Sequence, residues 1–160
     1  MAVITHQQAS KLFTDYVLGN SGSVTPPASW TMGLSTTLVS SMARDSIWSV
    51  TVSGTNINEI GSTTAAGYAR QTIARTIAQG GIDWGTSTYN SGTGQTTAAD
   101  QVTFGAFTGS GPSPNGAKSW TITDGSTLNA GNPYVSADTA ATRTFAVGDT
   151  EKVTASVQVG

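Results

Sequence analysis

The chain has 160 residues, of which 10% are charged, and its formal net charge is −2. Without a basic cluster, the sequence gives no support for nucleic-acid binding through phosphate neutralisation. The lack of cysteine excludes disulfides and thiolate metal sites, and no apolar run reaches the ~18 residues that span a membrane.

The first predicted element is an amphipathic helix within residues 4–19, covering about residues 5–18. Its apolar residues recur at three- and four-residue spacing and form one stripe: Ala9, Leu12, Phe13, Tyr16 and Val17. Thr5 and Gln8 have the spacing of a capping box, and Gly19 is a typical stop. We expect the stripe to pack on the chain's own sheet rather than on a neighbouring subunit. The same stretch lacks the basic and apolar regions of a signal peptide.

Short runs with strand character follow, separated by turn signals. The predicted strands cover residues 30–34, 47–53, 67–73, 101–107 and 119–123. Residues 39–44 are ambiguous, and residues 67–81 can also be interpreted as a short helix, although Thr and Ile favour a strand. The polar segments 54–66 and 85–99 predict surface loops.

A closing hairpin is predicted over residues 142–159. Phe145 and Val147 alternate with polar residues before the Gly148-Asp149-Thr150 turn, and Val153, Ala155, Val157 and Val159 alternate after it. Residues that oppose each other across an antiparallel pair share a face. An odd-length loop centred on Asp149 therefore keeps the apolar residues of both strands on one buried face. The other face carries Thr and Ser residues that suit uncharged contact between subunits.

These elements predict an all-β fold, an antiparallel sandwich of about seven or eight strands with one short N-terminal helix. We expect a single domain over residues 1–160.

Sites for catalysis are hard to find in the sequence. The only imidazole, His6, belongs to the first turn of the predicted helix, where we expect it to be exposed. The carboxylates are sparse and nothing singles out a catalytic pair, so we expect no enzymatic activity, cofactor or metal. Residues 124–132 carry oxygen ligands, but their spacing differs from a calcium loop, and a turn is the better interpretation.

Glycan binding is the stronger functional alternative, because tryptophan rings can stack on sugars. Trp30, Trp48 and Trp120 lie in predicted strands, where core packing is common. Trp84 precedes a polar loop and is the candidate glycan contact, together with residues 86–97.

Several motifs in order resemble a group of small bacteriophage virion proteins described as tail-fibre or minor structural proteins. The strongest match is Gly67-Tyr-Ala-Arg-Gln71, similar to the group's "GGYARQ" element. Others are the helix ending in Leu-Gly, the strand at residues 29–37, Val102-Thr-Phe104, Trp120-Thr-Ile-Thr-Asp124, Gly131-Asn-Pro-Tyr-Val135 and Val147-Gly-Asp-Thr150. This sequence departs from the group by extra residues at about 40–62 and 72–97.

The resemblance implies a structural role in a virion, with other virion proteins and copies of the chain itself as partners. Within that role we favour a capsid decoration or cement protein; the alternative is a tail protein that binds a host receptor or glycan. The candidate structural or interface residues are Tyr68, Arg70, Asp149, Leu12, Phe13 and Tyr16. For Arg70 we expect a structural hydrogen-bond network, and for Asp149 capping of the turn.

Overall fold

The computed structural model describes residues 3–17, 27, 29–49, 55–61, 65–74, 84, 88–91, 94–109, 111 and 116–159. The fold is all-β with one short helix near the N-terminus, as the sequence predicts. Its elements are β1 (Val3–Thr5), α1 (Gln7–Val17), β2 (Ser29–Ser35), η1 (Val39–Ser41), β3 (Trp48–Ser49), β4 (Ile57–Asn58), β5 (Gln71–Ala74), β6 (Thr88–Asn90), β7 (Gly94–Ala98), β8 (Val102–Gly105), β9 (Ala117–Thr123), β10 (Pro133–Arg143), β11 (Thr150–Val153) and β12 (Ser156–Val159).

The largest sheet is five-stranded and antiparallel, in the order β1-β10-β9-β2-β5. Its register aligns the apolar residues of neighbouring strands: Met32 of β2 pairs with Ile122 of β9, and Leu34 pairs with Trp120. Because alternate residues point to opposite faces, this register gives the sheet one apolar face.

A second layer covers that apolar face. Strand β11 pairs with β8, and β12 pairs with β7, which also pairs with β6. A backbone hydrogen bond of 2.9 Å from Ala99 N to Ala155 O continues the pairing between these two parts. The main core lies between the layers and includes Met32 and Trp120 from one layer and Val102 and Phe104 from the other. This is the sandwich arrangement that the sequence predicts.

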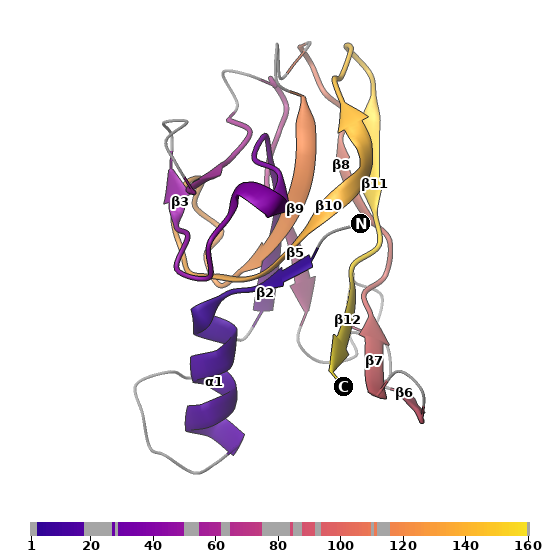
Figure 1. Cartoon of the computed structure of the whole chain (residues 1–160). Helices are drawn as coiled ribbons and strands as arrows, with labels where there is room; N and C mark the ends of the chain where they lie inside the picture. The colour runs from indigo at the N-terminus through magenta and orange to yellow at the C-terminus, as the bar shows by residue number, and fades with distance from the viewer. Residues whose placement is uncertain are drawn as a thin grey trace.

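The opposite face of the five-stranded sheet carries small hydroxyl residues, which are also buried: Thr31, Ser35, Ser119, Thr121, Thr123 and Ser136. Residues 36–49 and 55–61, which include η1 and the parallel pair β3–β4, cover this face. The hydroxyl of Ser119 donates to the carbonyl of Thr37 over 2.7 Å. Figure 1 shows β3 on one side of β9 and β10, with β8 and β11 on the other side. The central sheet is therefore covered on both faces.

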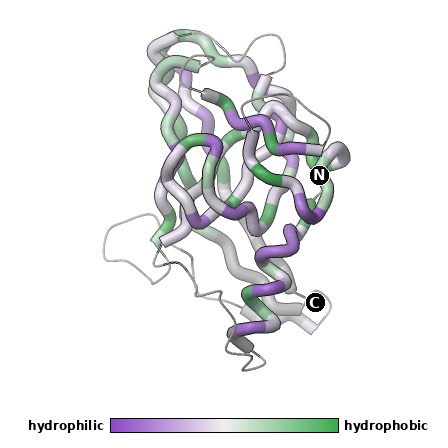
Figure 2. Tube along the Cα trace, turned by 90° about the vertical axis from the view of Figure 1, so that its left-hand side faces the viewer, coloured by the Kyte–Doolittle hydropathy of each residue, from purple (hydrophilic) through white to green (hydrophobic). Residues whose placement is uncertain are grey.

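The helix begins later than predicted, because Val3–Thr5 forms strand β1 and pairs with β10. Thr5, the predicted cap, pairs with Val135, and α1 starts at Gln7. The end predicted at Gly19 lies outside the described residues. In Figures 1 and 2, α1 extends from one end of the body of strands, with hydrophilic and hydrophobic residues along its length.

The predicted closing hairpin is wrong. Strand β11 pairs with β8, Arg143 pairs with Ala117, and Phe145 forms a bridge with Gly111. Phe145 and Val153 are buried as expected, but Val147 is 71% exposed. Alternation indicates which residues are buried and does not identify the neighbouring strand, so it cannot distinguish a hairpin from pairing with a distant strand.

Both predicted surface loops are also wrong in part. Residues 54–66 contain β4 and place Ile57, Ile60 and Ala65 in the core. Residues 85–99 contain β6 and β7, whose threonines suit a strand. Predicted strand 47–53 is seen only at Trp48–Ser49, because residues 50–53 lie outside the described part, and predicted strand 67–73 begins at Gln71.

Candidate functional site

The most connected polar site is centred on a buried ion pair between Glu59 and Arg70. Glu59 follows β4 and forms a bridge with Ser35 of β2, while Arg70 directly precedes β5. Arg70 Nε lies 2.6 Å from Glu59 Oε1, and Arg70 Nη2 lies 2.8 Å from Glu59 Oε2. The two side chains are 1% and 0% exposed, and the guanidinium lies 4.4 Å from the centre of the Trp48 ring. The pair therefore joins the covering segment after β4 to the start of β5 beneath the surface.

Tyr68 belongs to the same network. Its hydroxyl donates to Glu59 Oε1 over 2.9 Å and accepts the backbone N–H of Leu34 over 2.9 Å. Burial, and then the negative charge of Glu59, holds the pKa of Tyr68 well above its ordinary value. The phenol is therefore a neutral hydrogen-bonding group that connects the ion pair to β2.

Gly33 leaves the room that this network needs. A Cβ at this position would lie 2.9 Å from Glu59 Oε1, 3.0 Å from the Trp48 ring and 3.2 Å from the Tyr68 hydroxyl. A residue with a side chain would therefore displace the network from β2.

Arg70 also holds the loop between β9 and β10. Its Nη1 donates to the carbonyls of Gly125 and Ala130, the latter over 2.8 Å. The N–H of Asn129, which has a positive φ of 56°, donates to Glu59 Oε2 over 2.5 Å. These two loop carbonyls therefore face an internal guanidinium, which supplies the positive charge that a bound cation would supply.

Asp124, at the start of this loop, is engaged by the loop's own end. Its Oδ1 accepts the N–H of Asn132 over 2.7 Å, and its Oδ2 accepts the Asn132 amide over 2.8 Å and the Tyr134 hydroxyl over 3.2 Å. Burial, together with the charge of Asp124, raises the pKa of Tyr134 to about 12. These bonds make residues 124–132 a closed turn, which is the interpretation that the sequence favours over a calcium site.

Asp149 lies apart from this network and caps a turn. Its Oδ2 accepts the N–H of Ala146 over 2.8 Å, and its backbone N–H donates to Ala146 O over 3.1 Å. Backbone bonds between Gly148 and Phe107, and between Phe107 and Asp149, attach the turn to the chain after β8. The side chain acts on local geometry, as we expect for an aspartate in a turn.

The three helix candidates are far from the ion pair in the chain and are only partly covered. The helix contacts β10, and Leu12 is half-buried, but Phe13 is 57% exposed. The side chain of Tyr16 lies outside the described part of the structure. Packing on the chain's own sheet therefore covers only part of the predicted stripe.

The glycan candidate Trp84 is half-buried, packs against the main core and bridges to Ala99. Trp48 and Trp120 are buried as the sequence predicts, and Trp30 is half-buried against the same core. The exposed aromatic residue in this region is Tyr89 on β6, which is 75% exposed.

His6 is completely buried, and the prediction of an exposed first-turn residue is wrong. Its Nε2 lies 2.8 Å from the hydroxyl of Ser136, which lies 2.7 Å from the hydroxyl of Thr121. Burial lowers the pKa of His6, and the backbone carbonyls of Arg44 and Ala43 partly oppose the shift. The strand β1 causes this burial, because it brings the start of α1 against β10.

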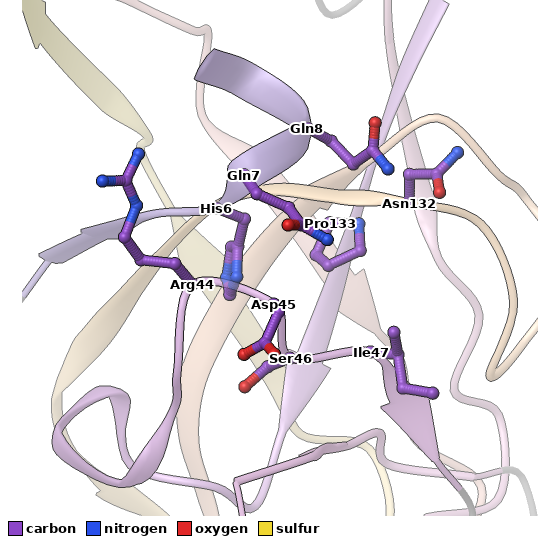
Figure 3. Close-up of a pocket in the computed structure, with 9 residues that line it drawn as sticks. All are labelled: His6, Gln7, Gln8, Arg44, Asp45, Ser46, Ile47, Asn132 and Pro133. Carbon is purple, nitrogen blue, oxygen red and sulfur yellow. The ribbon is translucent and has the colours of Figure 1, made fainter. Parts of the chain in front are cut away.

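A small pocket of about 30 Å³ lies beside His6, large enough for about one or two water molecules. Its lining comes from the start of α1, the segment 44–47 and the start of β10. Figure 3 shows the imidazole pointing from the start of α1 toward the segment that carries Arg44 and Asp45. The pocket is too small for an organic substrate, whose sites are usually about 300–1,000 Å³.

Sequence reasoning missed Glu59, which was one carboxylate among several in a predicted loop. The signal that could have found it is Arg70 itself, since an arginine within an apolar strand requires a buried counter-ion.

Among the described residues, no group of three or more His, Cys, Asp or Glu side chains is placed to hold a metal ion. The helix that the structure describes is not long and apolar enough to cross a membrane. Comparison of the chain with protein-family models and with curated proteins found no match.

Proposed function

We propose that the protein is a non-enzymatic structural component of a bacteriophage virion, attached to the outside of the capsid as a decoration or cement protein. The motif residues support this proposal. Tyr68 and Arg70, from the element that most resembles virion proteins, are committed to a buried network, and Asp149 caps a turn. In this proposal the motifs build a rigid scaffold and perform no chemistry.

The surface supports the same role. Only 10% of the residues are charged, so few charges are available to the exposed faces. Thr144 and Thr154 near β11 are exposed hydroxyl residues, and Phe13 on α1 adds an exposed uncharged ring. Neutral surfaces of this type suit permanent contact with neighbouring protein, because little charge has to be desolvated. The partners in this proposal are the major capsid protein and further copies of the chain.

A glycan-binding tail protein is the second candidate. The observation that favours it is the exposed ring of Tyr89 on β6, because an exposed aromatic face can stack on a sugar. Trp84, the candidate from the sequence, packs on the core, so this function would depend on Tyr89 instead.

Separated heads and tails of the bacteriophage that encodes the chain distinguish the two candidates. The amount of the protein in each fraction is measured by quantitative mass spectrometry against the major capsid and tail proteins. We expect the protein in the head fraction at a constant ratio to the capsid protein. Recovery with tails would favour the glycan-binding candidate, and absence from both fractions would contradict a virion role.

A further inference from the structure

We propose that His6 is a pH-sensitive switch, and that protonation of its imidazole releases residues 3–17, here called the N-terminal arm, from β10. The arm is β1 together with α1. This inference is independent of the proposed function, because it concerns only how the arm is attached.

The arm has few attachments to the sandwich, and His6 is at their centre. Strand β1 pairs with β10 only through Val3, Ile4 and Thr5. The backbone N–H of His6 then donates to Tyr134 O over 2.8 Å, and that of Gln7 donates to Arg44 O over 2.8 Å. The arm therefore depends on a short strand and on the contacts made where β1 meets α1.

The surroundings of the imidazole favour its neutral form. The ring is 0% exposed, Nε2 bonds to Ser136, and Nδ1 has no hydrogen-bond partner among the described residues. A protonated ring has two N–H donors, and the backbone carbonyls of Arg44 and Ala43 offset only part of the cost of burying its charge.

The charged groups on the described elements around His6 form no hydrogen bond or ion pair with the imidazole that would stabilise its protonated form. Arg44 and Asp45 line the pocket beside the ring, and the guanidinium of Arg44 donates to the Ser10 hydroxyl over 2.6 Å. On β10, a carboxylate oxygen of Asp138 accepts the N–H of Val39 over 2.9 Å. The first turn of α1 has no acidic residue. A positive charge on His6 would therefore be buried beside exposed groups of both signs, with Arg44 repelling it and Asp45 attracting it.

The direction of the pH effect follows from the lowered pKa of His6. A depressed pKa in the docked arm means that docking is fully stabilised above the ordinary value of about 6.5. The stabilisation is lost as the pH falls below that value, because the released arm binds the proton more tightly. The ratio of docked to released arm falls by up to about tenfold for each pH unit below about 6.5.

Hydrogen exchange of the full-length protein, measured by mass spectrometry at about pH 7.5 and about pH 5 and corrected for the intrinsic rate, tests this proposal. We expect protection of peptides from residues 3–17 to fall at the lower pH, by up to roughly 30-fold, with β8 and β11 unchanged. His6→Gln, which is neutral at both pH values, should remove the difference between them. Unchanged protection of the arm in the natural protein would overturn the proposal.

A second measurement does not depend on the folding of a variant. Because His6 is the only histidine, the natural protein gives a single imidazole signal in a pH titration by NMR. We expect a midpoint below about 6.5, accompanied by shifts in the amide signals of the arm. A midpoint at or above that value, or a titration without any change in the arm, would contradict the switch.

Discussion

Arg70 and Glu59 form a two-bond ion pair, with Arg70 Nε 2.6 Å from Glu59 Oε1 and Nη2 2.8 Å from Oε2, and neither side chain reaches solvent. The pair connects the segment covering the hydroxyl face of the central sheet to the start of β5. Through Nη1 it also holds the loop between β9 and β10. One buried pair thus fixes three segments that are separate in the chain.

Removing one charge of this pair should destabilise the fold strongly. We expect Glu59→Gln to lower the free energy of unfolding by about 3–5 kcal/mol, because it leaves the Arg70 charge buried without its counter-ion. Urea unfolding measures the effect. Glu151→Gln is the matched control, since Glu151 pairs with a largely exposed Arg143 at 3.4 Å and should change stability by about 0–1 kcal/mol. Equal effects of the two variants would contradict the structural role of the buried pair.

Tyr68→Phe tests the hydroxyl that connects the pair to β2. The substitution leaves the N–H of Leu34 without its acceptor and Glu59 with one donor fewer. We expect a loss of about 1–3 kcal/mol in urea unfolding. Tyr89→Phe, at an exposed position, should stay within about 0.5 kcal/mol of the natural protein. A neutral Tyr68→Phe variant would show that the hydroxyl is dispensable.

Gly33→Ala tests the close approach of the network to β2. The added methyl group would lie 2.9 Å from Glu59 Oε1 and 3.0 Å from the Trp48 ring. We expect a loss of about 1–3 kcal/mol from overpacking, measured as a lower midpoint of unfolding. An unchanged midpoint would mean that the ion pair can move away from β2 without cost.

Calcium should have no effect on stability, although residues 124–132 are rich in oxygen ligands. Arg70 already occupies the carbonyls of Gly125 and Ala130, and Asp124 is bonded to Asn132 and Tyr134. We expect the same Tm in EDTA and in about 5 mM calcium, which exceeds the dissociation constants of about 0.1–1 mM of weak extracellular calcium modules. A rise in Tm with calcium would contradict this account of the loop.

Attachment to the particle should resist salt. With few charged residues, the proposed contact with the capsid depends on neutral groups, which salt does not screen. We expect the protein to stay on particles washed in about 1 M NaCl, where the Debye length is about 3 Å. Quantitative mass spectrometry of the washed particles measures retention. Complete release by salt would show that the contact is electrostatic.

The sequence predicts the fold class because alternation in the central strands is clear. Met32 and Leu34 lie on one face of β2, and Thr31 and Ser35 on the other. The pattern does not reveal that residues 36–49 and 55–61 cover the hydroxyl face, since buried and exposed threonines look alike in a sequence. For this reason the sequence predicts a surface loop at Ile57, Glu59 and Ile60.

The errors about the hairpin and His6 have a related cause. Phe145 and Val153 are both buried, but their backbone partners are Gly111 and Val102, which are distant in the chain. His6 has the position of an exposed residue in the first turn of the predicted helix. Only the pairing of β1 with β10 brings it into the protein interior. Both depend on long-range contacts that local patterns do not encode.

The measurement that tests the proposed function most directly is a cryo-electron microscopy reconstruction of purified particles of the encoding bacteriophage. The account predicts density for the two-layered β-structure on the outer surface of the capsid, repeated in register with the capsid lattice. A capsid without this density, in a preparation from which mass spectrometry also finds the protein absent, would contradict it.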